Sequence, residues 1–494
     1  MSQTAAQKAA PPQTVKKQVA FAALFLIEMW ERFGYYGMTA VIVLFMVQKL
    51  GYSDDRATLT FGAFAAMVYA GPAVGGFIGD RILGSRRTTV LGALVLASGY
   101  VLLAIPDVPL FAALSVVAVG NGLFKANPAN LVSKVYEGDQ ARIDSAFTIY
   151  YMAVNLGAAV SQILTPLIAI WLGWHVAFAV CAGGLAVGVI NYFVMYKHIA
   201  PYGSEPDFKP LNYRSLALVL GGTAVAGGLI FVIVQDQVIA RWVVYGATAC
   251  LIGIFAYLIA NGDAQEKKGL IAVLLLTVQT VVFFIFYQQM STSLTLFALR
   301  NVDLHFLFGY QIPAGQVQAL NPIWIFILSP ILAWTYTRLG QGDGGDFSIA
   351  AKFAMGFVVL SLGFFTYGAS GWFGHAGKVS VWWMISGYAL QSLAELLISG
   401  LGLAMVARYV GPRLRGFIMG VWFLATGLSQ YLGSVVATIA SVPKNVMDPV
   451  QTLPLYTHLF FGLGAVAVAG ALGALAMLPL MRRLSAPAAQ LAAA

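Results

Sequence analysis

Long apolar runs alternate with short polar segments along most of the chain, from about residue 21 to residue 483. Each run has about 20 residues or more, which is the length that a helix needs to cross roughly 30 Å of hydrocarbon. We count about fourteen runs of this length, and the boundary at Asp236 is the least distinct. They begin near Phe21, Ala57, Thr88, Pro109, Ile143, Gly173, Ser215, Ala240, Gly269, Gln316, Ser348, Ser380, Leu414 and Leu455. The pattern predicts an all-α membrane protein with about 14 transmembrane helices.

The composition supports this class. Of the 494 residues, 60% are hydrophobic and only 10% are charged, whereas a soluble domain carries about 25% charged residues. Residues 1–20 are polar, and no small-residue cleavage site follows the first apolar run. We therefore expect residues 1–20 to be a cytoplasmic tail and the run from Phe21 to be a retained helix rather than a signal peptide. Residues 484–494 are predicted to form a flexible C-terminal tail.

The net charge of +9 raises the question of a nucleic-acid partner. With an even number of spans, most of the 28 lysine and arginine residues fall in the loops and tails on the same side as the two termini. Because cytoplasmic loops carry an excess of basic residues, this bias predicts that both termini are cytoplasmic. The positive charge thus follows from membrane topology, and we expect the lipid bilayer, not nucleic acid, to be its partner.

Two longer polar stretches divide the chain, at residues 197–214 and 262–268. The two runs between them hold almost no polar residue at mid-depth except Thr223, and helices of this kind rarely line a path for a polar solute. We interpret residues 199–268 as a linker and an inserted helix pair at the periphery. This leaves a six-helix bundle at residues 21–198 and a second at residues 269–483, an arrangement typical of parallel repeats.

The segment from Gly76 to Arg87, which includes Asp80 and Arg81, lies between the second and third runs. It resembles the G-x-x-x-D-R-x-x-G-x-R loop of the major facilitator superfamily. The equivalent position in the second half, from Tyr336 to Gly340, keeps only part of that motif. The resemblance implies the major facilitator fold: two six-helix halves plus an inserted two-helix hairpin.

Five ionisable residues lie within the apolar runs: Glu28, Glu31, Arg32, Lys125 and Glu395. Each costs roughly 2.5–3.5 kcal/mol to place at bilayer depth, so such residues mark a functional site or a structural ion pair. A rise of 1.5 Å per residue puts Glu28, Arg32, Lys125 and Glu395 at depths of about 12, 18, 13 and 20 Å from the cytoplasmic edge. Charges from three helices therefore share one layer. A proton relay and a purely structural network both remain open.

Polar and aromatic residues accompany these charges. Tyr36, Tyr69, Tyr151, Asn155 and Asn321 are all within spans, where side chains of this kind face a wet cavity or form interhelical hydrogen bonds. Their number favours a cavity. Phe284 and Trp422 fit either the wall of that cavity or the packed core.

Two segments are similar to the signatures of the proton-dependent oligopeptide transporters. Glu28 to Gly37 reads E-M-W-E-R-F-G-Y-Y-G and resembles E-x-x-E-R-F-x-Y-Y-G. Tyr150 to Ala158 resembles F-Y-x-x-I-N-x-G-S, with Tyr150 in place of Phe. Lys125 and Glu395 match the fourth-helix lysine and tenth-helix glutamate of that family. The resemblance extends over about residues 21–483 and is strongest to the bacterial dipeptide and tripeptide permeases.

The resemblance implies a proton-coupled symporter of dipeptides and tripeptides in the bacterial inner membrane. Glu28 and Glu31 would carry the coupling proton, with Arg32 and Lys125 as their partners. Arg32 and Lys125 would also hold the peptide carboxylate, and Glu395 with Asn155 and Asn321 would receive the amino terminus. The other substrate-binding residues expected are Tyr36, Tyr69, Tyr151, Phe284, Gln288, Ser399 and Trp422. We expect the chain to function as a monomer.

The sequence departs from the family pattern at two positions. Thr39 stands where many members have a second basic residue, and Gln288 stands where many have an acid on the seventh helix. Losing both charges together avoids an unpaired buried charge. Our hypothesis is that the outer gate closes through Thr39 and Gln288 or their neighbours, without an ion pair at these two positions.

Other classes of function are less well supported. The five histidines lie in loops or at span ends without ligand spacing, and Cys181 and Cys250 fit no metal site. We therefore expect neither an enzyme nor a bound cofactor or metal. The remaining alternative is a carrier of the same fold for another small polar solute, such as nitrate or an amino acid.

Overall fold

The computed structural model describes residues 13–306, 309–340, 347–399, 402–442 and 448–485. Within these ranges, 13 helices are long and apolar enough to cross a membrane. The 32-residue helix α1 (Gln13–Leu44) is not among them, because Glu28, Glu31 and Arg32 interrupt its apolar sequence. Counted with α1, the spans agree with the number that the hydrophobic pattern predicts.

The first half of the chain forms one bundle. In addition to α1, its helices are α2 (Asp54–Ala70), α3 (Pro72–Arg81), α4 (Ser85–Ala104), α5 (Leu110–Phe124), α6 (Asn127–Val135), α7 (Gln140–Trp171) and α8 (Trp174–Val194). Helix α1 packs against α7 and α8, and α4 packs against α5 and α8. The pairs α2–α3 and α5–α6 each form one span, and Pro72 and Pro128 open the second helix of each pair. A proline is tolerated in the first turn of a helix but interrupts the helix that precedes it.

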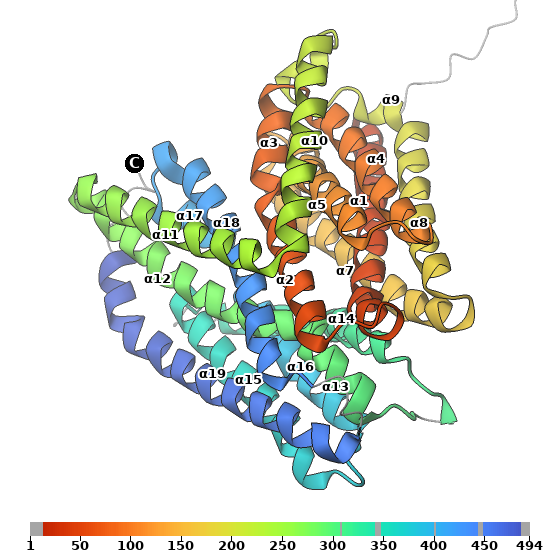
Figure 1. Ribbon diagram of the computed structural model, residues 1–494. Helices are drawn as coiled ribbons and strands as arrows, with labels where there is room; N and C mark the ends of the chain where they lie inside the picture. Colours follow the sequence, from red (N-terminus) through yellow and green to blue (C-terminus); the bar gives the residue numbers. More distant parts are fainter. Residues whose placement is uncertain (1–12, 307–308, 341–346, 400–401, 443–447, 486–494) are drawn as a thin grey trace, which may run out of the picture.

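The second half forms the other bundle. Its helices are α12 (Ala264–Tyr287), α13 (Ser293–Asn301), α14 (Leu320–Gly340), α15 (Ile349–Ala369), α16 (Val381–Ile398), α17 (Gly402–Tyr409), α18 (Pro412–Ala437) and α19 (Pro449–Ser485). Helix α15 packs against α16 and α19, and α12 packs against α18. Two short parallel strands, β1 (Val302–Asp303) and β2 (Val379–Ser380), pair beside the ends of these helices. In Figure 1 the helices of the first half stand upright above the oblique helices of the second half.

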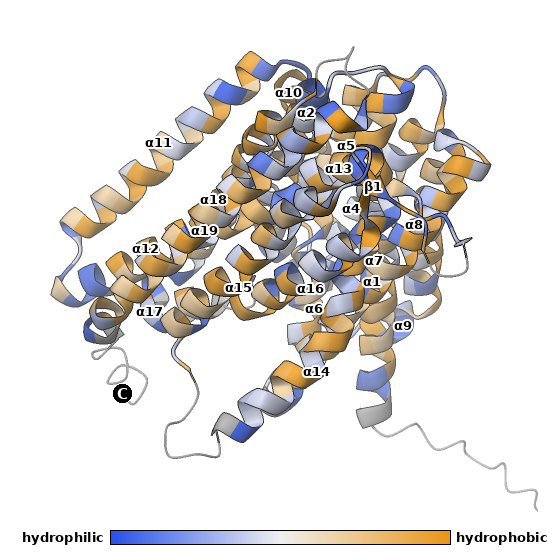
Figure 2. Ribbon diagram, turned by 90° about the horizontal axis from the view of Figure 1, so that it is seen from below, coloured by the Kyte–Doolittle hydropathy of each residue, from blue (hydrophilic) through white to orange (hydrophobic). Residues whose placement is uncertain are grey.

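The inserted pair consists of α10 (Tyr213–Gln235) and α11 (Gln237–Asn261). The boundary at Asp236 is confirmed, because its carboxylate caps α11 by accepting from the backbone amides of Val238 and Ile239. Only 11% of the apolar stretch of each helix is buried, so the pair lies at the periphery. Helix α10 packs against α2 and α5 of the first half, whereas α11 packs against α12 and α18 of the second. Figure 2 shows apolar residues along most of α11 and hydrophilic residues near its ends.

The segment before α10 is hydrogen-bonded to the first half. It contains α9 (Tyr196–Ile199) and the 3-10 turn η2 (Glu205–Phe208). Asp207 accepts from the backbone amide of Arg86 at 3.2 Å, and the Arg86 guanidinium donates to the Asp207 carbonyl at 2.8 Å. Gly84, with φ of 97°, turns the chain toward this contact. The segment therefore docks on the loop between α3 and α4 that contains the superfamily motif.

Close backbone contact between α3 and α5 depends on glycine. A Cβ atom at Gly75 would overlap the carbonyl of Gly122, and a Cβ atom at Gly71 would lie 2.7 Å from the Gly122 Cα. Small residues allow membrane helices to approach this closely.

We expect Gly75→Val to lower the free energy of unfolding by at least about 1–3 kcal/mol, because the added side chain has only backbone to displace. The control is Gly183→Val on α8, where a Cβ atom meets nothing within 4 Å. The measurement is the thermal unfolding midpoint of the purified protein in detergent. Equal midpoints for the two variants would contradict this account of the α3–α5 contact.

Candidate functional site

Four charged side chains of the first half form a buried cluster. The Arg32 Nε atom makes an ion pair with Glu31 and lies 3.5 Å from Glu28 Oε1. Lys125 Nζ lies 3.9 Å from the same Glu28 oxygen. Glu28, Glu31 and Arg32 are at most 3% exposed, whereas 37% of the Lys125 side chain is exposed. The predicted grouping of these four residues is thus observed, with two positive and two negative charges.

Neutral donors complete the hydrogen bonds of the two carboxylates. The Tyr150 hydroxyl donates to Glu28 Oε2 at 2.6 Å, and Asn121 Nδ2 donates to Glu31 Oε1 at 3.3 Å. These two residues were not predicted as part of the site. Arg32 keeps one donor atom free, because its buried Nη2 atom has no hydrogen-bond partner among the residues that the structure describes. An unpaired buried guanidinium donor is costly and suits an anionic ligand.

The aromatic residues after Arg32 connect this cluster to a cavity. The Arg32 guanidinium lies 5.3 Å from the centre of the Tyr35 ring and 6.0 Å from that of Tyr36. Tyr36 lines a cavity of about 80 Å³ between the two halves. The other predicted residues that line it are Tyr151, Asn155, Asn321 and Glu395. Amides from both halves and the Glu395 carboxyl group of the second half therefore face the same space, with Arg32 behind Tyr36.

Glu395 is the acidic group of this cavity. It lies on α16, is 8% exposed, and accepts from Asn321 Nδ2 at 2.7 Å. Asn321 also donates to Ser392 Oγ at 3.1 Å, so its orientation is fixed within the second half. Asn155, from the first half, donates to the Tyr151 carbonyl at 2.9 Å and keeps its carbonyl oxygen available.

Other predicted residues are not among those that line this cavity. The Tyr69 ring, from α2, lies 6.4 Å from the Phe284 ring of the second half. Trp422 is buried and packs on Phe423, and its indole Nε1 has no partner. Ser399 follows α16 one turn after Glu395 and is half-buried.

The cavity also has a wall that the sequence did not reveal. Its members outside the predicted set are Val154, Ala158, Gln162, Tyr287, Met290, Ser291, Gln318 and Pro322. The Gln162 side-chain oxygen is buried without a partner. Gln162 follows Asn155 by two helical turns on α7, so the two residues share one face of that helix. Helical periodicity in the sequence could therefore have predicted Gln162. Gln318 and Ser291 lie in 3-10 turns, which carry no helical periodicity to extend.

Thr39 and Gln288 each bond within their own half. Thr39 Oγ1 donates to the Tyr36 carbonyl at 3.1 Å, and Gln288 Nε2 donates to Ser434 Oγ at 3.2 Å. Among the described residues, no hydrogen bond joins these two side chains to each other. The hypothesis that they form a gate stays a prediction.

An ion pair that the sequence did not reveal joins the halves elsewhere. Arg300, at the end of α13, donates from Nη2 to Asp54 Oδ1 at 2.6 Å and from Nη1 to the other carboxylate oxygen. Arg300 also donates to the Tyr456 hydroxyl at 2.9 Å, and the Val442 amide donates to Asp54 at 3.1 Å. The Asp54 side chain is 2% exposed. A bidentate pair with additional hydrogen bonds is a strong contact between the halves.

The two halves are closed at the end that contains this ion pair. A further hydrogen bond between them, from Gln316 to the Ile163 carbonyl at 2.7 Å, also lies toward this end. The central cavity of about 80 Å³ is smaller than the roughly 300–1,000 Å³ of a typical small-molecule pocket. The halves must move apart before the cavity admits a solute larger than a few water molecules.

Comparisons with known proteins identify the family. Residues 86–455 match the model of the POT family. The chain belongs to the POT family. It is 43% identical over 481 residues to dipeptide and tripeptide permease B of Salmonella typhimurium, covering 96% of this chain and 98% of that one. It is 42% identical over 484 residues to the permease B of Yersinia enterocolitica, covering 97% and 98%.

Solved structures of POT proteins have the same fold. A crystal structure of PepTSo2, described as tetrameric, superposes with a TM-score of 0.87 at 53% identity, covering 95% of this chain and 99% of that one. A peptide transporter POT in complex with sulfate gives a TM-score of 0.83 at 25% identity, covering 96% and 99%. This POT-family chain is therefore a multi-pass membrane transporter with the major facilitator fold, and it is not an enzyme.

The Asp54–Arg300 pair predicts strong coupling in stability. We expect Arg300→Gln and Asp54→Asn each to lower the free energy of unfolding by about 3–5 kcal/mol, because each leaves a buried charge unpaired. The double variant should lose less than the sum, with a coupling of about 0.5–3 kcal/mol. The measurement is denaturation of the four proteins in detergent. Arg300→Lys keeps the charge without the bidentate geometry and should lie between wild type and Arg300→Gln. Additive losses in the double variant would show that the two side chains do not interact.

Proposed function

We propose that this protein imports dipeptides and tripeptides together with protons by alternating access. The observation that carries the proposal is that basic groups belong to one half and an acid to the other, with Tyr36 between Arg32 and the cavity that Glu395 lines. Arg32 and Lys125 belong to the first half, and Glu395 belongs to the second. A short peptide is a zwitterion whose carboxylate and ammonium groups fit these two signs. Its relatives are named as dipeptide and tripeptide permeases, which supports the same substrate class.

Charge balance in the buried cluster supplies the coupling. Glu28 and Glu31 already balance Arg32 and Lys125. A peptide carboxylate that binds at the free Nη2 donor of Arg32 adds one negative charge to this group. An uncompensated charge is expensive at bilayer depth, so peptide binding favours proton uptake by one of the two glutamates. Because these carboxylates interact, the proton belongs to the pair rather than to one residue.

Closure of the site follows when one peptide contacts both halves at once. A peptide held by its carboxylate on the first half and by its ammonium group at Glu395 draws the halves together. Asn155 and Asn321 flank Glu395 in the same cavity and would bond the amino terminus and the peptide amide. The contracted cavity fits a state from which peptide is absent, and widening it is the step that admits substrate.

The Asp54–Arg300 pair serves as the outer closure in this scheme. It joins α2 to α13 at the end where the halves meet, while Thr39 and Gln288 lack charge. Opening toward the outside must break this pair and hydrate both groups. Thr39 and Gln288 would then contribute close packing at the gate, and the ion pair would supply the specific contact.

The proposal also covers the membrane in which the protein lies and its oligomeric state. We propose the bacterial inner membrane, with both termini in the cytoplasm, on the basis of the basic residues in the loops on that side. Every residue proposed to bind peptide or proton comes from one chain, so a monomer contains a complete site. The assembly described for PepTSo2 as tetrameric would then place several such sites side by side.

Proteoliposome uptake tests the substrate class. We expect an inward proton gradient to drive accumulation of a labelled dipeptide, because peptide termini match both charged half-sites. A free amino acid and nitrate are the comparison solutes, since a carrier for either is the alternative function. Accumulation of one of these without competition by dipeptides would overturn the peptide assignment.

Neutral variants of the cluster test the coupling. Glu28→Gln or Glu31→Gln should abolish gradient-driven accumulation while keeping peptide exchange, because the variant clamp still forms but carries no proton. The measurement compares concentrative uptake with counterflow of labelled dipeptide at equal pH on both sides. Glu266→Gln, in the first turn of α12 and outside the cluster, is the control. If concentrative uptake persists in both cluster variants, the proton travels elsewhere, and Glu395→Gln is the next variant to measure.

A further inference from the structure

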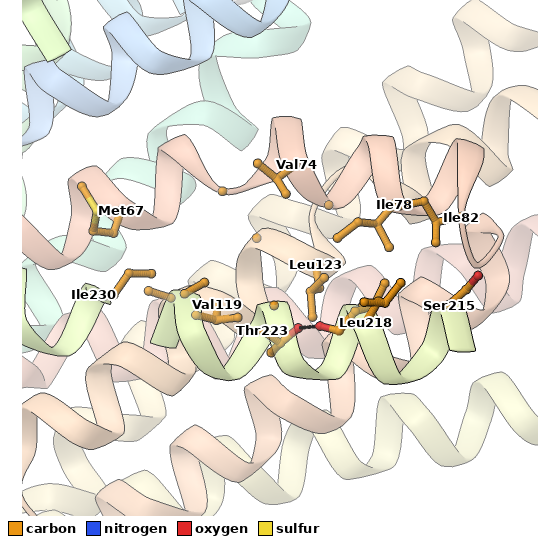
Figure 3. Close-up of a pocket in the computed structure, with 17 residues that line it drawn as sticks. Met67, Val74, Ile78, Ile82, Val119, Leu123, Ser215, Leu218, Thr223 and Ile230 are labelled. Carbon is orange, nitrogen blue, oxygen red and sulfur yellow. Dashed lines mark hydrogen bonds between the residues drawn. The ribbon is translucent and has the colours of Figure 1, made fainter. Parts of the chain in front are cut away.

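A second cavity lies outside the central one, between the inserted helix α10 and the first-half helices α2, α3 and α5. Its volume is about 390 Å³. Figure 3 shows Met67, Val74 and Ile78 on one side and Val119, Leu218 and Ile230 among the residues that close the other. It does not share a residue with the cavity around Glu395.

The cavity is apolar at mid-depth. Its polar side chains are Thr223 and Ser215. The Thr223 hydroxyl donates to the Val219 carbonyl at 2.7 Å, so it has no need of a ligand (Figure 3). Water in such a space would lack the two to four polar partners that an ordered water requires. The occupant must therefore be apolar along this part.

A missing side chain on α10 leaves part of this space open. Gly222 lines the cavity, and a Cβ atom there would meet nothing within 4 Å. Gly71, Gly75 and Gly122 also line it, but they lie in the close backbone contact between α3 and α5. A cavity of about 150 Å³ holds benzene, so by proportion this one has room for roughly fifteen carbon atoms. Only 11% of the apolar stretch of α10 is buried in the protein, so the surroundings of α10 are the acyl chains of the bilayer.

Positive charge gathers at one mouth of the cavity. Ile82 and Ser215 lie together at this end in Figure 3, and each directly follows an exposed arginine, Arg81 and Arg214. In the described part of the chain, neither arginine has a recorded ion pair. The loop bias assigns this end to the cytoplasmic side, where basic residues between helices attract anionic lipid.

Of three acids near this mouth, two pair with other basic residues and the third accepts hydrogen bonds from neutral donors. Asp80 accepts from Asn130 at 2.5 Å, and Asp207 lies 3.6 Å from Arg86. Glu205 pairs with Lys209, whose hydrogen bond holds the pKa of the Glu205 carboxyl below its usual value, and the charge of Arg81 lowers this pKa further. Arg81 therefore also interacts with the exposed Glu205, whereas in the described part of the chain these acids make no ion pair with Arg214.

We propose that this cavity binds one acyl chain of an anionic phospholipid, with the lipid phosphate at Arg81 and Arg214. The chain fills the gap between α10 and the first half, where no side chain reaches. The lipid thereby becomes part of the packing that holds the inserted pair against the first half. This inference does not depend on which solute the protein carries.

The test uses the full chain in proteoliposomes that contain phosphatidylglycerol with a photoactivatable acyl chain. After illumination, labelled peptides are mapped by mass spectrometry. We expect labels within residues 67–82, 118–123 and 215–230. Gly222→Phe should reduce this labelling by about tenfold, because displacing even two methylene groups removes burial worth that factor. The matched control is Gly221→Phe, since Gly221 is also unobstructed but does not line the cavity.

A second variant protects the test against a folding defect. Ala226→Phe lies one turn further along the same face of α10 and serves if Gly222→Phe is not monodisperse. Equal labelling in a cavity-filling variant and in Gly221→Phe would overturn the proposal. Cross-links that join two copies of the chain through these residues would overturn it as well, and would identify a subunit interface.

A separate experiment tests the assignment of the lipid headgroup. A photoactivatable phosphatidylethanolamine should label the same residues less than phosphatidylglycerol does. Arg214→Gln should remove this preference, and Arg214→Lys should keep it, because only the first variant loses the charge. Equal labelling by the two lipids in the wild-type protein would overturn the anionic lipid as the occupant.

Discussion

The cost of an unbalanced charge at bilayer depth constrains the whole protein. Arg32 and Lys125 are tolerated only beside Glu28 and Glu31, and each carboxylate takes a further hydrogen bond from a neutral donor. The cluster is neutral as it stands, yet Arg32 retains an unpaired donor. In the proposed mechanism, a site in this condition responds to an added carboxylate by binding a proton. Binding and coupling thus follow from one electrostatic requirement.

The two halves obey the same requirement at their outer contact. Asp54 and Arg300 are buried against each other, and each makes a further hydrogen bond to a group of the second half. Separation of the halves exposes both side chains to water, where each charge is stable alone. The contact can therefore open without leaving an unpaired charge buried in the protein. In the proposed gate, Thr39 and Gln288 lack charge, and the ion pair lies at Asp54 and Arg300 instead. A buried pair of residues between the halves avoids an uncompensated charge when both residues are charged, as at Asp54 and Arg300, or when both are neutral, as at Thr39 and Gln288.

The inserted pair connects the halves without joining the polar path. Helix α10 leans on the first half and α11 on the second, and both expose most of their surface. Any relative motion of the halves must therefore be absorbed along this pair. The apolar cavity beside α10 is a loose part of that packing, and an acyl chain fills it with material that can deform as the halves move.

The sequence alone determined the helical spans, the charged cluster of α1 and the cavity residues Tyr36, Tyr151, Asn155, Asn321 and Glu395. Apolar run length and the rarity of buried charge are local properties, and residues three or four apart share a helix face whatever surrounds them. Only the tertiary structure decided that Asp54 meets Arg300, that Tyr150 caps Glu28, and that the docking segment before α10 binds Arg86. These contacts join residues more than a hundred positions apart, and no periodicity encodes such a distance. The cavity residues Ser291 and Gln318 were not predicted for a related reason. They lie in 3-10 turns, and the direction of these turns depends on the helices packed around them.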